Sequence, residues 1–340
     1  MDEINLLNAG PLLNEEGQLN EIGYAFSLLK NYDRKMIKKH RQRIKEWDSY
    51  IIIDKDYAVI LKVGDYSYFG LILAAVIDFK NRKRQTRMYT SIFTYGDFHM
   101  PSNTNEGDVF VENKKYSMFF QNKNGKRRLV CRVNKLKDKK DFSCDIVLKP
   151  TTPHSIVVAD VLKDKNYFIY SQKVNLLSVK GYFKFGDVTH QFTSNAFATF
   201  EFGRGFLDYV DSFTSSDFNT RIDNHLLSLH LFNGRYPNVN ENVLYIDSEI
   251  YSMGEISFIP TLNDKGKIDY DSNWKILDKE GHIDLIFKPI KNRFTKLICP
   301  FMSFDENQIF GIFTGTIINK NKEYKIEEVI GVLENTKNRY

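Results

Sequence analysis

The sequence is poor in cysteine, in tryptophan and in long apolar runs. Its three cysteines, Cys131, Cys144 and Cys299, show neither an even disulfide framework nor the spacing of a metal site. The longest apolar run, residues 68–79, is shorter than the roughly 20 residues that a helix needs to cross a bilayer. The acidic N-terminus lacks the apolar core of a signal peptide. These absences predict a reduced, cytoplasmic protein without a transmembrane segment.

Standard catalytic motifs are missing as well. The segment from Gly203 to Asp208 resembles a dinucleotide fingerprint superficially, but it lacks the third glycine and a βαβ setting. The sequence contains no Walker lysine loop, no serine elbow and no His-Glu-x-x-His helix. These absences argue against a Rossmann, kinase or α/β-hydrolase fold, and we expect neither a cofactor nor a metal site.

The sequence is rich in phenylalanine and tyrosine, with 27 and 19 residues, and both favour strands. After Trp47, short apolar or alternating runs are separated by polar turns, which is typical of a sandwich or barrel. About twenty strands exceed one small barrel, so we predict an all-β chain with two tandem barrel or sandwich domains. We place them at residues 1–175 and 176–340. Residues 66–79 are apolar on both faces, as expected of a strand between two layers.

Basic residues are concentrated in the first half of the chain. Residues 20–47 predict either one helix or two short helices with a strongly basic face. That face is typical of a solvated helix that covers a barrel edge, or it binds an anionic partner such as nucleic acid or a lipid surface. Carboxylates outnumber basic residues over 201–340, which gives the two halves opposite charge although the whole chain carries +5.

The most informative segment, residues 195–211, places charges among aromatic residues. Glu201, Arg204 and Asp208 alternate with phenylalanines, and two glycines flank the arginine. Charges in an aromatic strand are costly unless they are paired, so the segment holds a structural ion pair or faces a ligand. A second polar cluster follows and includes Glu241. The candidate ligand-binding residues of both clusters are Asn195, Phe202, Gly203, Gly205, Tyr209, Asn233, Arg235 and Asn242.

Two other groups of polar residues have less support as sites. His225 and His230 are five residues apart, which places them on opposite faces of a strand and argues against a shared metal. The aspartates at 208, 211, 217 and 223 match no standard calcium spacing. Cys131 and Cys144 are expected to be neighbours on two strands of one hairpin and to remain thiols.

Several short motifs follow one another in an order that resembles a microbial domain-of-unknown-function family. They are Gly10–Asn14, Asp65–Gly70, Ile77–Phe79, Asn175–Gly181, Phe202–Gly205, Asn233-Gly234 and Glu241-Asn242. The resemblance covers roughly residues 8–336. That family in turn is similar to two-barrel, lipocalin-like proteins such as carotenoid hydratase and tocopherol cyclase. This likeness implies paired barrels with a hydrophobic pocket and a long apolar substrate.

One feature departs from the family. Where relatives have tryptophans around and after the Arg-Gly segment, this chain has Phe202, Phe206, Phe213 and Phe218. Aromatic bulk is kept, but indole N–H donors are lost. Chemistry that needs an indole is therefore in doubt.

Three hypotheses for function remain open at this point. In the first, a hydratase, isomerase or cyclase uses Glu201 as acid, Arg204 to orient it, and Asp208 or Glu241 to stabilise positive charge on an isoprenoid or lipid-like substrate. In the second, the protein is a non-catalytic carrier of a lipid or other apolar molecule. In the third, the basic first half binds an anionic surface. The sequence does not fix an oligomeric state.

Overall fold

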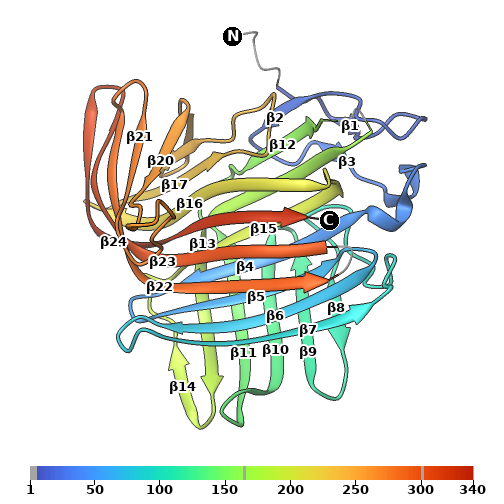
Figure 1. The fold of residues 1–340 in the computed structure, drawn as a ribbon, viewed down its shortest axis with the longest axis horizontal. Helices are drawn as coiled ribbons and strands as arrows, with labels where there is room; N and C mark the ends of the chain where they lie inside the picture. The colour runs from blue at the N-terminus through green and yellow to red at the C-terminus, as the bar shows by residue number, and fades with distance from the viewer. Residues whose placement is uncertain (1–5, 164–165, 300–301, 340) are drawn as a thin grey trace.

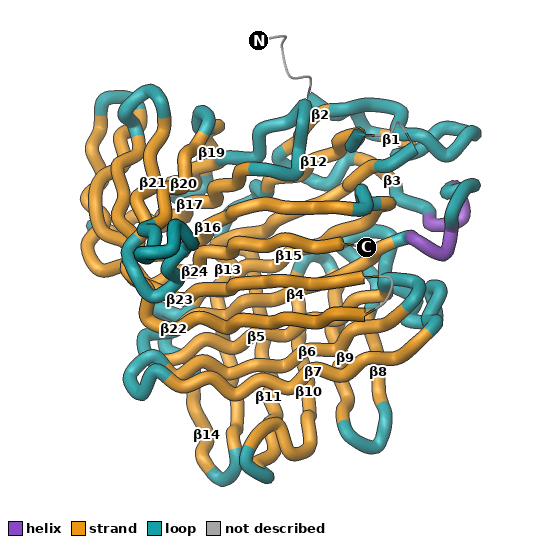
Figure 2. Tube along the Cα trace, viewed as in Figure 1, coloured by secondary structure: helices purple, strands orange, loops and turns teal. Residues whose placement is uncertain are grey.

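The computed structural model describes residues 6–163, 166–299 and 302–339, and it confirms an all-β fold built from two large antiparallel sheets (Figures 1 and 2). The first sheet has the order β7 (Lys83–Ile92), β6 (Phe69–Asp78), β5 (Tyr57–Asp65), β4 (Lys45–Ile53), β15 (Phe197–Phe206), β13 (Phe168–Phe185), β11 (Lys140–Pro150), β10 (Lys126–Lys137), β9 (Tyr116–Lys123) and β8 (Val109–Glu112). Beside this path, β12 (Ile156–Val161) and β14 (Val188–Gln191) pair with β13, and β2 (Gly23–Ala25) pairs with β12.

The second sheet is formed by the last third of the chain. Its order is β19 (Glu249–Ser252), β18 (Val243–Ile246), β17 (His225–Asn233), β16 (Val210–Ile222), β24 (Lys322–Arg339), β23 (Met302–Asn319), β22 (Ile283–Cys299), β21 (Trp274–Asp278) and β20 (Ile256–Pro260). The chain passes from the first sheet to the second between Phe206 and Val210. The Phe-Gly-Arg-Gly segment therefore belongs to the first sheet, and residue 175 lies inside β13. The division into domains at that residue stays a prediction.

The N-terminal basic segment is less helical than the sequence suggests. Residues 20–47 contain β2, β3 (Lys30–Asn31) and two single-turn 3-10 helices, η1 (Arg34–Met36) and η2 (Arg41–Arg43). The two turns are the purple elements of Figure 2. β3 pairs in parallel with β1 (Gly10–Pro11) in a small separate sheet. A single helix over residues 20–47 is therefore wrong, whereas short helical turns are present; side chains of this segment such as Ile37 and Ile44 are buried against the first barrel core. No helix in the described part of the chain is long and apolar enough to cross a membrane.

Each sheet curls around a core of its own, and the two sheets also pack against each other. Along β5, Val59 and Leu61 enter the core of the first sheet, whereas Ala58 and Ile60 belong to a separate cluster with Phe310 of the second sheet. The two-residue period of a strand produces this division. β6 is likewise buried on both faces, as the sequence predicted for residues 66–79. Strands β4, β5, β6 and β15 therefore form a wall between two interiors.

The cysteine pair is also placed as expected. Cys131 on β10 and Cys144 on β11 are direct cross-strand partners, and both are buried free thiols. Burial raises the pKa of the Cys131 thiol well above its usual value, which keeps this sulfur protonated.

Candidate functional site

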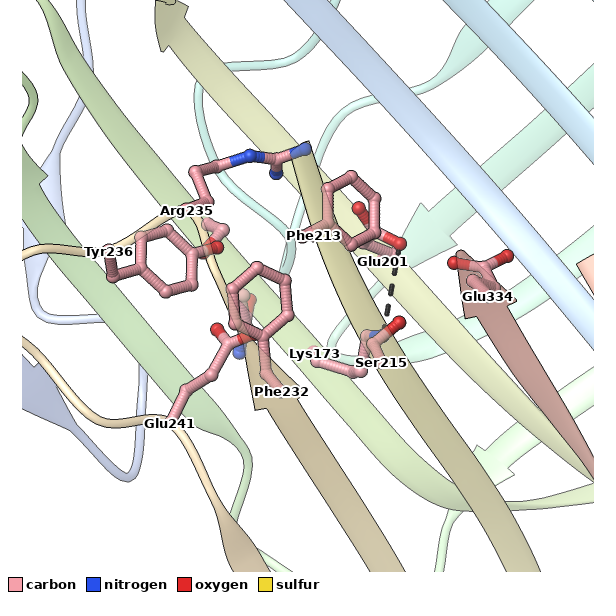
Figure 3. Close-up of a pocket in the computed structure, with 11 residues that line it drawn as sticks. Lys173, Glu201, Phe213, Ser215, Phe232, Arg235, Tyr236, Glu241 and Glu334 are labelled. Carbon is pink, nitrogen blue, oxygen red and sulfur yellow. Dashed lines mark hydrogen bonds and ion pairs between the residues drawn. The ribbon is translucent and has the colours of Figure 1, made fainter. Parts of the chain in front are cut away.

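Two adjoining cavities lie between the sheets, beside β13 and β15 on one side and β16 and β24 on the other. Their volumes are about 20 and 60 Å³, and their shared wall consists of Glu201, Phe213, Arg235 and Glu334 (Figure 3). A cavity of roughly 10–15 Å³ accommodates one water molecule when polar groups surround it. The two cavities therefore form a polar chamber with room for a few waters.

Glu201 reaches the chamber because it lies on the face of β15 that is turned towards the second sheet. Its Oε1 accepts a hydrogen bond of 2.9 Å from the indole nitrogen of Trp47, and its Oε2 is 3.9 Å from Nζ of Lys173. The side chain is 31% accessible, which its place on the wall of both cavities explains. Burial opposes ionisation, but Lys173, Lys62 and the Trp47 hydrogen bond outweigh it and lower the pKa of Glu201. Glu201 is therefore a carboxylate.

Gly203 makes the contact between Trp47 and Glu201 possible. A Cβ at Gly203 would lie 2.1 Å from the indole ring of Trp47, its cross-strand partner on β4. The absence of a Cβ at Gly203 leaves room for the ring, whose N–H donates to Glu201. An indole donor therefore reaches this segment from another strand.

Arg204 does not orient Glu201, because the two side chains lie on opposite faces of β15. The Arg204 guanidinium is fully buried, 2.9 Å from Oδ1 of Asp48. It also donates to the carbonyls of Trp47, Gly203 and Pro101 at 2.8–3.1 Å. The Phe202 ring lies beneath it, 3.9 Å from the guanidinium carbon. The expected Glu201–Arg204 contact is therefore wrong, and Arg204 is a buried structural ion pair inside the first barrel.

A chain of buried charges leads away from the chamber. Nζ of Lys173 lies 3.0 Å from Asp217, and Asp217 lies 2.9 Å from Nδ1 of His230. The other ring nitrogen of His230 is 3.1 Å from Glu241, which returns to the chamber wall. Burial opposes the charge on His230, but the carboxylates of Asp217 and Glu241 raise its pKa. Burial likewise opposes ionisation of Asp217, yet Lys173 and His230 hold its pKa well below the usual value.

Glu334 enters the chamber from β24 of the second sheet. Burial raises its pKa, and the nearby negative charge of Glu201 raises it further against the opposing effect of Lys173. One oxygen of Glu334 accepts a hydrogen bond from Gln308. Two carboxyl groups on one cavity thus have pKa values shifted in opposite directions, lowered for Glu201 and raised for Glu334.

Arg235 closes one side of the chamber. Its guanidinium forms a two-pronged ion pair with Asp211, at 2.9 and 2.7 Å, and lies over the Phe213 ring at 4.3 Å. Arg235 is one of three predicted site residues on the chamber wall, together with Glu201 and Glu241.

The other predicted residues lie elsewhere. Asp208 accepts a hydrogen bond from the backbone of Lys163, and Asn195 and Tyr209 are exposed. Phe202 is part of the first core, and Gly205 lies against the carbonyl of Phe168. Asn233 donates to the carbonyl of Ile256, and Asn242 donates to the carbonyl of Gly254. These asparagines fix the loops that follow β17.

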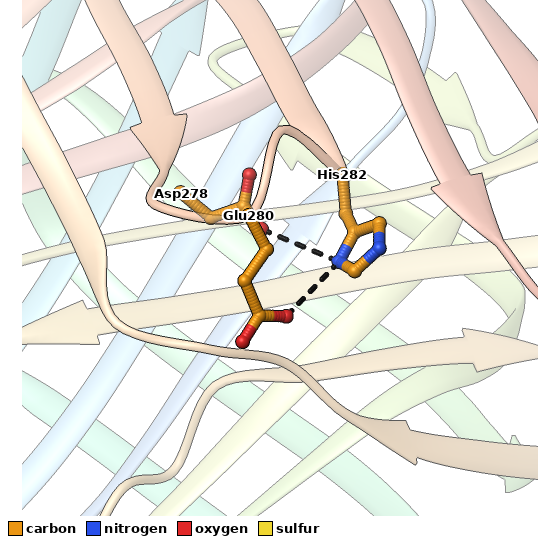
Figure 4. A group of neighbouring side chains, drawn as sticks. All are labelled: Asp278, Glu280 and His282. Carbon is orange, nitrogen blue, oxygen red and sulfur yellow. Dashed lines mark ion pairs between the residues drawn. The ribbon is translucent and has the colours of Figure 1, made fainter.

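A possible metal-binding group lies in the turn between β21 and β22, away from the chamber. Asp278, Glu280 and His282 each offer a ligand atom, and these atoms lie within 4.8 Å of one another (Figure 4). Nδ1 of His282 is 3.2 Å from Glu280 and 3.5 Å from Asp278, so ion pairs already occupy the group. His225, for its part, lies 2.7 Å from Asp247 and far along the strand from buried His230.

Sequence reasoning missed Lys62, Lys173 and Glu334. A signal was present, since each is a charge whose neighbours two residues before and after it on the strand are uncharged. What the sequence lacked was the pairing of the two sheets, which brings residues 173, 201 and 334 to one place.

The comparison with protein families shows to which family this chain belongs. The model of the domain of unknown function DUF2804 matches residues 3–340. The chain belongs to this family. No curated protein matches the sequence. Among solved structures, this DUF2804 chain is similar to a protein assigned as AttH from Nitrosomonas europaea, with a TM-score of 0.51, 13% identity, and coverage of 86% of this chain and 92% of that one.

A second similar structure is kievitone hydratase from Nectria haematococca. The TM-score is 0.52, the identity is 14%, and the match covers 87% of this chain and 88% of the hydratase. At these identities the likeness establishes the fold. This DUF2804 protein therefore has the two-barrel, lipocalin-like architecture that the sequence resemblance implied.

Proposed function

We propose that this DUF2804 chain is a hydratase-type enzyme that adds water to a carbon–carbon double bond or removes it. The observation that carries the proposal is the pair of carboxyl groups, Glu201 and Glu334, on one small polar chamber with pKa shifts of opposite sign. General acid–base chemistry needs one group that holds a proton and one that accepts it at the same pH. The similarity to a hydratase supports the same reaction class.

In the hydration direction, the protonated carboxyl of Glu334 gives its proton to one carbon of the double bond. A water in the chamber attacks the other carbon while the carboxylate of Glu201 takes a proton from that water. The product is an alcohol, and one proton transfer from Glu201 back to Glu334 restores the starting state. Glu201, which the sequence favoured as the acid, is assigned as the base because its pKa is lowered.

Side chains around the two carboxyl groups position them and stabilise charge during the reaction. Lys173 keeps Glu201 ionised in the ground state, and Trp47 fixes the direction of its carboxylate. Glu241 faces the chamber with His230 behind it, and it provides negative charge near a carbon that becomes positive. A non-catalytic carrier of an apolar molecule has less support, because charged side chains line both cavities.

Incorporation of labelled water tests the proposal. The protein is incubated in ¹⁸O-water with a panel of isoprenoid and fatty alkenes, and the products are read by mass spectrometry. We expect the wild-type chain to add labelled water to at least one alkene. Glu334→Gln and Glu201→Gln should each lower the rate by about 10²–10⁴-fold.

The matched control is Glu327→Gln, since Glu327 lies on the same strand β24 but is exposed. This variant should keep the wild-type rate. Undiminished activity in Glu334→Gln, with the circular dichroism of a folded protein, would contradict the assignment of the acid.

A further inference from the structure

Two further spaces share lining residues with the chamber or with each other, and the outermost is an open groove. A narrow space of about 20 Å³ shares Lys62, Leu73, Arg293 and Glu306 with the larger chamber cavity. An open groove of about 370 Å³ then shares Leu73, Met88 and Thr295 with the narrow space. The spaces therefore lie in series along the seam between β6 and β7 of the first sheet and β22 of the second, and Leu73 is common to the outer three.

The outer groove is basic. Arg84 and Lys137 approach it from the first sheet and exposed Lys296 from β22, and none of the described residues along the groove carries a carboxylate. The Arg84 guanidinium donates to the Phe294 carbonyl at 2.8 Å, and Nζ of Lys137 lies 3.3 Å from the Arg84 carbonyl, so backbone bonds fix both cations at the mouth. Asp305 faces Lys296 in the strand register but lies outside the groove lining. Clustered cations in a concave surface attract and orient an anion.

The narrow space behind the groove is largely apolar. Its walls are formed by Phe69, Leu71, Leu73, Met88, Leu297 and Phe304, and the charged groups Lys62, Arg293 and Glu306 come at its inner end. Arg293 is held there by hydrogen bonds to Gln308 at 2.7 Å and Thr295 at 2.8 Å. These apolar walls suit a hydrocarbon chain, and Met88 is a side chain that adapts to such a chain.

We infer that the substrate is a single-chain amphipathic carboxylate whose head group binds at Arg84, Lys137 and Lys296 and whose unsaturated chain extends between the sheets towards Glu334. The order of the spaces matches the order of such a molecule, with charge outside, hydrocarbon in the middle and the double bond at the chamber. The reaction at the far end rests on the proposed hydratase function, whereas binding of the head group and chain does not.

An anionic lipid bilayer offers similar head-group chemistry, but a bilayer lipid would contact the mouth alone. Binding is therefore measured by calorimetry with three probes. The first is an 18-carbon monounsaturated carboxylate below its micelle concentration, the second is the alcohol of equal length, and the third is vesicles with one third anionic phospholipid. All three are measured on the Glu334→Gln chain, whose mouth is intact, so that turnover does not interfere.

We expect the carboxylate to bind at least tenfold more tightly than the alcohol. Lys137→Glu and Lys296→Glu should each weaken carboxylate binding by about tenfold, because each reverses a charge at the mouth. The matched controls Lys123→Glu and Lys126→Glu, in the exposed turn between β9 and β10, should leave it unchanged. Met88→Trp should weaken binding of carboxylate and alcohol alike, since it fills the passage.

Equal affinity for carboxylate and alcohol would overturn the inference. Vesicle binding that is lost in Lys296→Glu, together with no binding of the free carboxylate, would overturn it in favour of a membrane contact. If labelled water is incorporated into an uncharged alkene while the carboxylate does not bind, this inference fails and the hydratase proposal stands.

Discussion

At the scale of single residues, the chamber shows how environment separates two identical side chains. Glu201 has two cations and an indole donor nearby, so its charge is stabilised. Glu334 has a neutral amide donor at one oxygen, and burial together with the negative charge of Glu201 raises its pKa. Neither difference is visible in the sequence, where both are glutamates in β-strands.

The protonation of Glu334 is directly measurable. We expect the wild-type protein to show the infrared carbonyl band of a protonated carboxyl group at pH values above 4.5, because burial and Glu201 raise the pKa of Glu334. In Glu334→Gln that band should weaken, because its Glu334 contribution is lost while buried Asp48 and Asp160 still contribute, and in Glu327→Gln it should keep its intensity. If the band is absent from the wild-type spectrum at pH 6, Glu334 is ionised and the acid must be another group.

Arg204 illustrates a different use of a buried charge. All of its hydrogen bonds go to Asp48 and backbone carbonyls within the first barrel. Removal of one partner of a buried ion pair leaves the other charge uncompensated and typically costs about 3–5 kcal/mol. The conspicuous arginine of the Phe-Gly-Arg-Gly segment thus supports the fold, while the glutamate three residues earlier faces the chamber.

At the scale of elements, the two glycines of β15 are explained by close contacts with the neighbouring strands β4 and β13. Trp47 of β4 covers Gly203, and the carbonyl of Phe168 on β13 would be 2.3 Å from a Cβ at Gly205. The two glycines therefore mark close approaches on both sides of the strand rather than a bend around a ligand.

Gly203→Ala tests this reading of the strand. The added Cβ would overlap the Trp47 ring, so we expect a loss of about 1–3 kcal/mol in the free energy of unfolding, as for other overpacked interiors. Denaturant titration measures the loss. Gly254→Ala is the matched control, because its Cβ would meet Glu280 at an ordinary 3.8 Å. Equal stability of the two variants would show that the indole moves aside without cost.

The all-β class and a short helical segment near the N-terminus were predictable from the sequence, and the strand pairing within the basic lead-in was not. The apolar pattern of residues 66–79 predicted a strand buried on both faces, which is β6, and Cys131 and Cys144 lie on the two strands of one hairpin, β10 and β11, as expected. The prediction of a single helix in the lead-in is wrong. Its lysines and arginines suit the face of a helix, but its buried isoleucines pack against the barrel, and the segment contains two 3-10 turns.

At the scale of the whole molecule, the site is a product of sheet packing. The sequence located Glu201, Arg235 and Glu241, because they are charges in aromatic or glycine-rich surroundings. It did not locate Lys173 or Glu334, because their proximity depends on which face of each sheet meets the other. It also predicted an apolar pocket, and the structure places charged groups on the inner chamber.

The buried charge network should make stability depend on pH. His230 has a raised pKa in the folded state, so its contribution to stability is full below its unfolded pKa of about 6.5 and is lost as the pH rises through the folded value. Asp217 has a lowered pKa, so its contribution is present above its unfolded value of about 3.9 and is lost in acid.

His230→Gln isolates the first of these effects. We expect the difference in unfolding free energy between wild type and variant to be largest near pH 6 and to shrink at higher pH. Denaturant titrations at several pH values measure it, with His225→Gln as the control, since His225 is about half exposed at the end of the same strand. A difference that does not change with pH would mean that His230 is neutral in the folded protein.

The wall formed by β4, β5, β6 and β15 has a consequence for how this family diverges. Successive side chains on these strands pack in different interiors: one side chain fills the first barrel, and the next faces the second sheet. Chamber chemistry can therefore change at every second position of the wall without disturbing the barrel core. A one-residue insertion, by contrast, would exchange the two sets of side chains and lose both interiors at once. Relatives with new specificities should differ by substitution along this wall and by insertion elsewhere.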